Sequence, residues 1–367
     1  MTYYLHLLSE QLQALNVFKY QTFRAGAAGM VAFLVCVIFG NYVIRKLISL
    51  KAGQPIRTAD EVHKLSELHG GKGGTPTMGG VLLLGAVVLC TVLFAVPTNP
   101  FIQVLLLVTI SLGALGFLDD FLKVKKRSSE GISARVKLMG QVGVAVAAGL
   151  ILMLRPETSE YVRSLHVPFF KAPLIEDMGW FALPFFAIVI VGCSNAVNLT
   201  DGLDGLATGC TITTGVAYAI FAYITGRQDW AENYLFLPYN EGVGEAAIFM
   251  MALVGAGLGF LWFNCHPAKV FMGDTGSLAI GGMLGTVAIC TRQELLLVVI
   301  GGVFVMEAFS VILQVASFKV RKKRIFAMAP IHHHFELKGW PESKVIVRFW
   351  ILSIMCALAG LATLKLR

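Results

Sequence analysis

Charged residues are scarce in this 367-residue sequence, of which Asp, Glu, Lys and Arg make up 14%. A soluble domain carries about 25%, whereas 56% of the residues here are hydrophobic. The composition excludes an ordinary soluble protein and predicts a chain embedded in lipid. The net charge of +8 does not imply a nucleic-acid partner, because excess Lys and Arg in membrane proteins usually lie in cytoplasmic loops. No basic, aromatic-interleaved nucleic-acid surface is present.

Paired cysteines and a cleavable leader are also missing. The seven cysteines form no C-x-x-C pair and mostly fall inside apolar runs, which predicts small buried side chains rather than a disulfide or zinc framework. No basic segment precedes the first apolar run, so no signal peptide is expected. Leucines at positions 5, 8, 12 and 15 instead predict a short helix over residues 1–20, either interfacial or packed against the protein.

Apolar runs near 20 residues long, the length of one membrane crossing, predict about ten transmembrane helices. The predicted spans are residues 24–44, 78–96, 101–118, 137–154, 180–198, 208–225, 245–263, 277–291, 295–318 and 345–364. A small hairpin is predicted around residues 166–170. The sequence has no internal repeat, so the inverted-repeat symmetry of many transporters has no support. Residues 1–367 are predicted to form a single all-α polytopic membrane domain.

Lys and Arg are unevenly divided among the connections. Of 30 such residues, 20 lie in segments 45–77, 119–137, 264–276 and 319–344. By the positive-inside rule these segments are cytoplasmic, and both termini lie on the outer, periplasmic side. The unusual polar residues all fall on the predicted cytoplasmic side, which predicts one cytoplasm-facing cleft.

The densest polar motif is SNAVNLTDGLDGLATG at residues 194–209, between two apolar runs. It contains Asn195, Asn198, Asp201 and Asp204. Polar groups at the mouth of two apolar segments are costly near a membrane unless they bind something. We therefore expect these four side chains to bind a ligand.

Three further acids lie on the same predicted face. Asp119 and Asp120 follow an apolar run, and adjacent carboxylates in such a setting resist ionisation unless a cation neutralises them. Mg²⁺ is the natural cation, because it binds carboxylates together with substrate phosphates. The alternative is a solvated helix end paired with nearby lysines. Asp274 in FMGDTGS would complete a metal site, or would cap the next helix.

Two more motifs flank these acids. HGGKGGTPTMGG at residues 69–80 offers backbone N–H groups and Lys72 to an anion, although it fails the Walker A spacing. Its alternative is a plain loop that enters a helix. His332, His333 and His334 cannot all face one metal as an i, i+4 pair would, so contact with substrate phosphate or sugar is favoured. Glu307 lies inside a predicted span and is expected to pair with a buried partner for structural reasons.

Five motifs together resemble those of bacterial phospho-N-acetylmuramoyl-pentapeptide transferases (translocase I, the MraY family). In chain order they are KGGTPTMGG, GFLDDFLK, NAVNLTDGLDGLA, FMGDTGS and PIHHHFELKGW. The resemblance covers essentially the whole chain. It implies that undecaprenyl phosphate attacks the β-phosphate of UDP-N-acetylmuramoyl-pentapeptide, giving UMP and lipid I. It also implies ten helices in the bacterial inner membrane, often as a dimer, and a requirement for Mg²⁺.

The resemblance also implies site roles. Asp119, Asp120 and Asp274 would be the catalytic and metal-binding acids, with Asp119 the best candidate to deprotonate or position the lipid phosphate. The expected substrate-binding residues are Lys72, Thr77, Lys137, Asn195, Asn198, Asp201, Asp204, Phe271, His332, His333 and His334. A sister transferase for UDP-N-acetylhexosamines and, from another class, an anion transporter remain alternatives.

Overall fold

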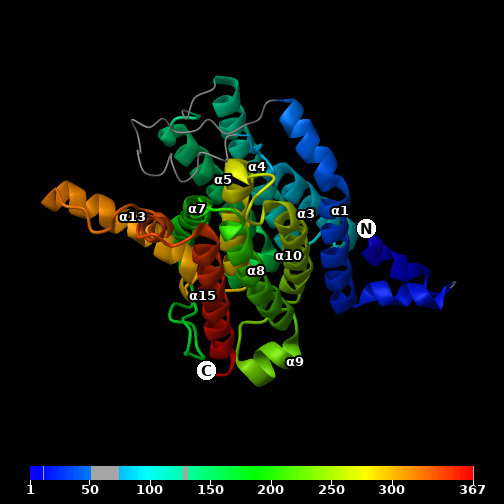
Figure 1. Ribbon diagram of the computed structural model, residues 1–367. Coiled ribbons are helices and arrows are strands. Elements are labelled where there is room, and N and C mark those ends of the chain that lie inside the picture. Colours follow the sequence, from blue (N-terminus) through cyan, green and yellow to red (C-terminus); the bar gives the residue numbers. More distant parts are fainter. Residues whose placement is uncertain (11, 51–73, 127–130, 367) are drawn as a thin grey trace.

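The computed structural model describes residues 1–10, 12–50, 74–126 and 131–366, and this part of the chain is almost entirely helical (Figure 1). It has no strand, and its one isolated antiparallel bridge, between Leu165 and Ile175, lies where a hairpin was predicted. The long helices are α1 (Gln21–Ser49), α3 (Gly80–Phe94), α4 (Pro100–Lys126), α5 (Ala134–Leu154), α7 (Ala182–Thr200), α8 (Leu206–Thr225), α10 (Glu245–Asn264), α11 (Gly273–Cys290), α13 (Gly302–Arg321) and α15 (Glu342–Ala362). The short ones include α6 (Pro156–Arg163), α9 (Gln228–Trp230), α12 (Leu297–Ile300) and α14 (Ile331–Leu337).

The prediction of an all-α polytopic membrane protein is confirmed. Within the described residues, eight helical segments are long and apolar enough to cross a membrane, and α3 is a shorter apolar helix of 15 residues. The remaining predicted span coincides with α11, which has 18 residues. The number of actual crossings and the side on which the termini lie stay predictions.

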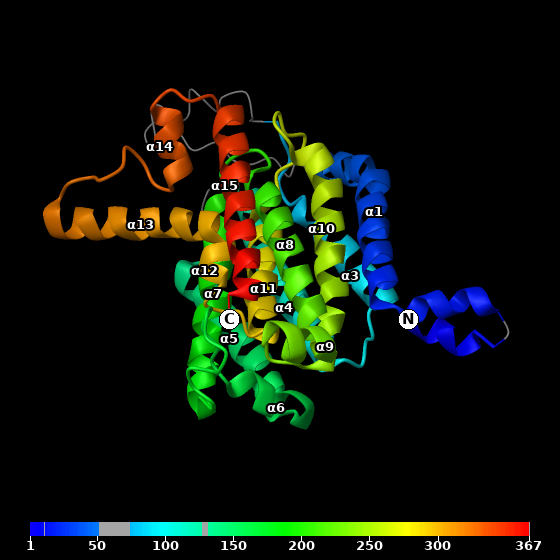
Figure 2. The ribbon, with the colours of Figure 1, turned by 90° about the horizontal axis from the view of Figure 1, so that it is seen from below.

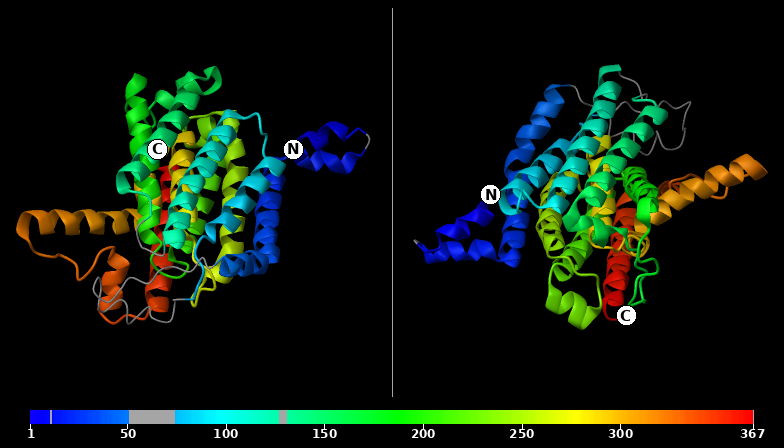
Figure 3. Two further views of the ribbon diagram at one scale, coloured as in Figure 1. Left: turned by 90° about the horizontal axis from the view of Figure 1, so that it is seen from above. Right: turned by 180° about the vertical axis from the view of Figure 1, so that it is seen from behind.

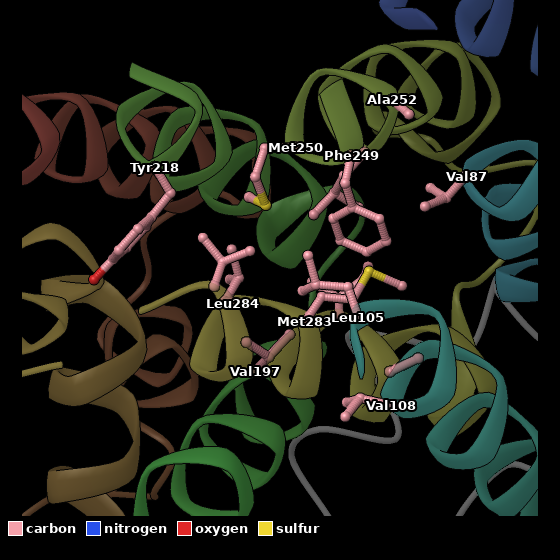
Figure 4. Close-up of a cluster of buried hydrophobic side chains, with 14 of the residues drawn as sticks. Val87, Leu105, Val108, Val197, Tyr218, Phe249, Met250, Ala252, Met283 and Leu284 are labelled. Carbon is pink, nitrogen blue, oxygen red and sulfur yellow. The ribbon is translucent and has the colours of Figure 1, made fainter. Parts of the chain in front are cut away.

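Helix α11 forms the centre of the bundle. Every residue from Thr275 to Cys290 is buried, and the helix packs mainly against α4 and α7. Figure 4 shows its Met283 and Leu284 among apolar side chains of the surrounding helices, including Leu105 and Phe249. A helix that is apolar on every face is expected to be buried in this way. Its one charged residue, Asp274, lies at the end where the site is found.

The predicted span 295–318 is broken into two helices. Helix α12 ends at Ile300, and α13 starts after Gly301 and runs out sideways from the bundle (Figure 2). Two glycines in succession, Gly301 and Gly302, are a common cause of a sharp change of direction. Large apolar side chains on α13, such as Phe309 and Ile312, are exposed, as expected of a helix that lies in lipid.

The N-terminal segment forms two 3₁₀ helices, Thr2–Leu8 and Gln13–Lys19, rather than the single helix predicted over residues 1–20. They project from the side of the bundle (Figure 3). The Met1 ammonium donates to the carbonyls of Val92 and Leu93 at 2.9 and 3.0 Å, where α3 ends. The start of α3 is bonded to the segment before α11, since the Gly80 N–H donates to the Met272 carbonyl at 2.9 Å. The end of α3 and the start of α1, whose Arg24 donates to the Phe94 carbonyl at 3.0 Å, therefore lie at the end of the bundle away from Asp274.

A buried ion pair stabilises that far end. The Arg24 guanidinium donates to both carboxylate oxygens of Glu245 at 2.7 and 2.8 Å, which joins α1 to α10. Breaking a buried pair by removing one partner typically costs about 3–5 kcal/mol.

We expect Glu245→Ala to lower the melting temperature in detergent markedly. Glu241→Ala, an exposed acid nearby, is the control, and equal melting temperatures of the two variants would contradict the assignment.

Candidate active site

The end of α4 approaches the start of α11 closely enough for the two helices to share polar groups. A side chain at Gly116 would overlap the carbonyl group of Asp274, so only glycine permits this contact one turn before Asp119. Asp119 and Asp120 then follow at 2% and 4% exposure. The close approach explains why two acids on α4 lie beside a third acid on α11.

Asp120 caps α11 from the neighbouring helix. Its carboxylate accepts from the N–H groups of Asp274 and Thr275 at 3.2 and 2.9 Å, and from the Thr275 hydroxyl at 2.7 Å. The first N–H groups of a helix have no partner within the helix and attract an anion. The alternative reading of Asp274 as the cap is therefore wrong, since α11 has no side-chain cap of its own.

Asp274 turns instead toward two lysines. The Lys123 and Lys137 ammonium groups each donate to its Oδ2 at 2.8 Å, and Asn198 donates to Oδ1 at 2.7 Å. Lys123 also lies 2.7 Å from Asp119 Oδ2. The two lysines thus hold Asp119 and Asp274 together across the α4–α11 contact.

Oxygen atoms of Asp119, Asp120 and Asp274 lie within 4.8 Å of one another, so the three acids form a group able to hold a metal ion. Carboxylate oxygens are the donors that Mg²⁺ prefers. Beside this group, a cavity of about 480 Å³ is lined by Asp119, Lys123, Lys137 and residues 131–134. An anion in this cavity would meet two ammonium groups next to a metal-binding cluster.

Asp201 adds a fourth carboxyl group just after the end of α7. Burial, together with the negative charges of Asp274 and Asp120, raises the pKa of Asp201 to about 8. The two ammonium groups contact Asp119 and Asp274, whereas Asp120 and Asp201 lie close to the charge of Asp274. A bound cation would offset this repulsion among the carboxyl groups.

Asp204 is held by residues that sequence reasoning missed. Its Oδ2 accepts from His266 Nδ1 at 3.1 Å and from the Ala268 N–H at 3.0 Å, and its own N–H donates to Glu342 at 3.1 Å. Asp204 and His266 lie in two separate connections and Glu342 begins α15, so only the fold brings the three together. No local pattern in the sequence marks this contact.

Of the remaining predicted residues, Thr77 and Phe271 lie near the acids, and Asn195 does not. Thr77 lies near Asp120 beside Gly273, and the Phe271 N–H donates to the Pro76 carbonyl at 2.8 Å, which joins the two loops. Asn195 does not reach the acids, because its amide donates to Gln141 at 3.0 Å. Lys72 lies outside the described residues.

The three histidines of α14 point in different directions. His332 is buried beside Glu307 of α13, with 3.1 Å between Nδ1 and Oε2. His333 pairs with Glu336 of its own helix at 2.7 Å, and His334 accepts from the Ala327 N–H. Glu307 thus has the buried partner that the sequence led us to expect.

Lys123 is a site residue that the sequence did not identify. The sequence offered it only as one of the lysines at a solvated helix end. It follows Asp119 by four residues, the spacing at which helical side chains meet. That spacing was the available signal.

The fold and site define a multi-pass membrane protein with an acidic cluster able to hold a metal ion, beside a cavity lined by two lysines. A family model described as glycosyl transferase family 4 matches residues 102–292. The phospho-N-acetylmuramoyl-pentapeptide-transferase of Methylacidiphilum infernorum (isolate V4) is 56% identical over 367 residues, 100% of both chains. Those of Maridesulfovibrio salexigens and Syntrophus aciditrophicus are 52% and 51% identical over 98% and 96% of both chains. The chain belongs to glycosyl transferase family 4, among the phospho-N-acetylmuramoyl-pentapeptide transferases.

The raised pKa of Asp201 gives a prediction for the metal-free protein. An unfolded Asp has a pKa of about 3.9, so folding raises the value to about 8. Asp201 therefore contributes stability that is fully present below about pH 4 and is lost as the pH rises through about 8. We expect the melting temperature in EDTA to fall between pH 6 and 8.5 less steeply in Asp201→Asn than in the wild type. Asp229→Asn, at an exposed position, should retain the wild-type slope, and equal slopes for all three proteins would refute the prediction.

Proposed function

We propose that this chain transfers phospho-N-acetylmuramoyl-pentapeptide from its UDP-activated donor to undecaprenyl phosphate, releasing UMP and forming lipid I. The observation that carries the proposal is the cluster of Asp119, Asp120 and Asp274 with Lys123 and Lys137 at one end of an apolar bundle. The full-length similarity to relatives of that name supports the same reaction.

The reaction exchanges one phosphorus–oxygen bond for another. An oxygen of the lipid phosphate forms a bond to the β-phosphorus of the donor, and the bond from that phosphorus to the UMP oxygen breaks, with its electron pair leaving on UMP. Because two anions must meet, the site has to offset negative charge. Asp119, which lines the cavity with Lys123 and Lys137, would take a proton from the lipid phosphate or position that group.

Asp119, Asp120 and Asp274 would hold Mg²⁺, since each offers an oxygen atom within reach of the others. When bound, Mg²⁺ offsets charge on the pyrophosphate oxygens and on the leaving group. Lys123 and Lys137, which contact Asp274, are placed to turn toward phosphate. The second cluster, at Asp204, includes a histidine and suits Mg²⁺ less well.

Substrate contacts are proposed around this centre. Asn198 and Lys137 would contact the phosphates, and Asp201, Asp204 and Phe271 would bind the uridine end. Further proposed contacts are those of Lys72, Thr77, Asn195, His333 and His334. We place the site on the cytoplasmic face of the inner membrane, where a nucleotide donor is available, and propose a homodimer on family resemblance alone.

The first test is UMP release from UDP-N-acetylmuramoyl-pentapeptide by detergent-purified protein. We expect release that depends on both undecaprenyl phosphate and Mg²⁺, that stops in EDTA, and that returns when Mg²⁺ is added back. Turnover of UDP-N-acetylglucosamine in place of this donor would move the protein to the sister transferases. Movement of substrate into proteoliposomes without any chemistry would favour a transporter.

The acids give the second test. We expect Asp119→Asn, Asp120→Asn and Asp274→Asn each to lower turnover by about 10³-fold or more, as loss of a principal electrostatic group does. Because Asn keeps the shape and an acceptor oxygen, each variant should stay folded, as a cooperative melting transition in detergent would show. Asp177→Asn, at an exposed position in the connection between α6 and α7, is the control. Retained turnover in any of the three variants would remove that residue from the mechanism.

A further inference from the structure

His332 and Glu307 are buried as a pair. Both side chains have 0% exposure, and His332 Nδ1 lies 3.1 Å from Glu307 Oε2. None of their side-chain nitrogen or oxygen atoms makes a hydrogen bond of good geometry. The contact between the two side chains is therefore what offsets the cost of removing each from water. Burying two ionisable groups together is costly and is weak evidence for stability, which suggests another role for the pair.

The other edge of the His332 ring meets the polar motif between α7 and α8. A Cβ atom at Gly202 would overlap His332 Nε2, so the imidazole occupies the space that a side chain would need. Gly202 does not have a positive φ angle. Its lack of a side chain is therefore required by the histidine rather than by the backbone conformation.

Gly202 lies between Asp201 and Asp204, the two acids proposed to bind the uridine end of the donor. The contacts thus run from Glu307 on α13, through His332 on α14, to the connection that carries both acids. The neighbouring histidines are placed differently, since His333 pairs with Glu336 and His334 accepts from Ala327. His332 itself is closed off from substrate at 0% exposure.

We propose that Glu307 is a positioning residue, which holds the His332 imidazole against Gly202 and thereby fixes Asp201 and Asp204 for the donor nucleotide. A carboxylate beside Nδ1 favours a proton on that nitrogen and so sets the orientation of the ring. The proposal rests on the proposed function. It assigns His332 an indirect role in donor binding rather than direct contact with phosphate or sugar.

The experiment measures UMP binding by titration calorimetry, together with KM for the donor and for undecaprenyl phosphate. Glu307→Gln keeps the size of the side chain but removes its charge. We expect about tenfold weaker UMP binding and a similar rise in donor KM, in the range of coupling between contacting residues, with the lipid KM within about twofold of wild type. Should Glu307→Gln fail to fold, Glu307→Asp, which withdraws the carboxylate by one methylene group, replaces it in the same measurements.

Glu294→Gln is the matched control. Glu294 is also buried and ion-paired, 2.7 Å from Arg292, but it lies just beyond the opposite end of α11. Its loss is expected to affect stability without changing UMP binding. Equal weakening of UMP binding in both variants would mean that Glu307 acts through general stability, and the proposal would be wrong.

A double-mutant cycle tests the contact with Gly202. Gly202→Ala should weaken UMP binding by pushing the ring away, yet should have little further effect in a His332→Ala background. Additive effects of the two substitutions would overturn the proposal. Wild-type protein that neither binds UMP nor releases it would instead refute the proposed function, whereas normal wild-type binding with an unaffected Glu307→Gln variant would refute only the positioning role.

Discussion

The contact between the Asp120 carboxylate and the first turn of α11 is the interaction on which the site depends. It satisfies N–H groups that the helix cannot pair itself, and it does so from the neighbouring helix α4. Because α11 is covered along its length, its position in turn fixes the helices that pack around it. The capping contact therefore sets the register between Asp119 on one helix and Asp274 on the other.

Once these two helices are in register, charge decides the chemistry of the site. Asp119 and Asp274 contact two ammonium groups, and Asp120 lies in the same group of acids. Burial and the charge of Asp274 raise the pKa of Asp201, and the cavity beside these acids is lined by side chains of both signs. Such an arrangement attracts a metal cation and the phosphates that accompany it. The apolar bundle contributes by keeping this cluster at one end, where a lipid-borne phosphate and a nucleotide can both arrive.

The connections around the site form a second layer of support. His266 and Glu342 hold Asp204, and the pair of Glu307 and His332 packs against Gly202. These residues come from α13, α14, α15 and the segment before α11, so the polar motif after α7 depends on most of the later half of the chain. Helix α13, which extends sideways from the bundle (Figure 2), is part of this support through Glu307.

The sequence by itself determined the membrane class, the positions of the long helices and the identity of the three clustered acids. These features can be recognised in short stretches of sequence. A membrane span needs about 20 apolar residues in a helix, because lipid cannot pair with polar backbone groups, and charged side chains are costly inside lipid and so lie at the ends of the spans. The sequence did not determine the break at Gly301, the two 3₁₀ helices at the N-terminus or the partners of individual side chains. Asn195 and Asn198 look equivalent in the sequence, yet Asn198 reaches Asp274 whereas Asn195 donates to Gln141. Only tertiary structure decided such partners, because they depend on which faces of helices distant in the chain meet.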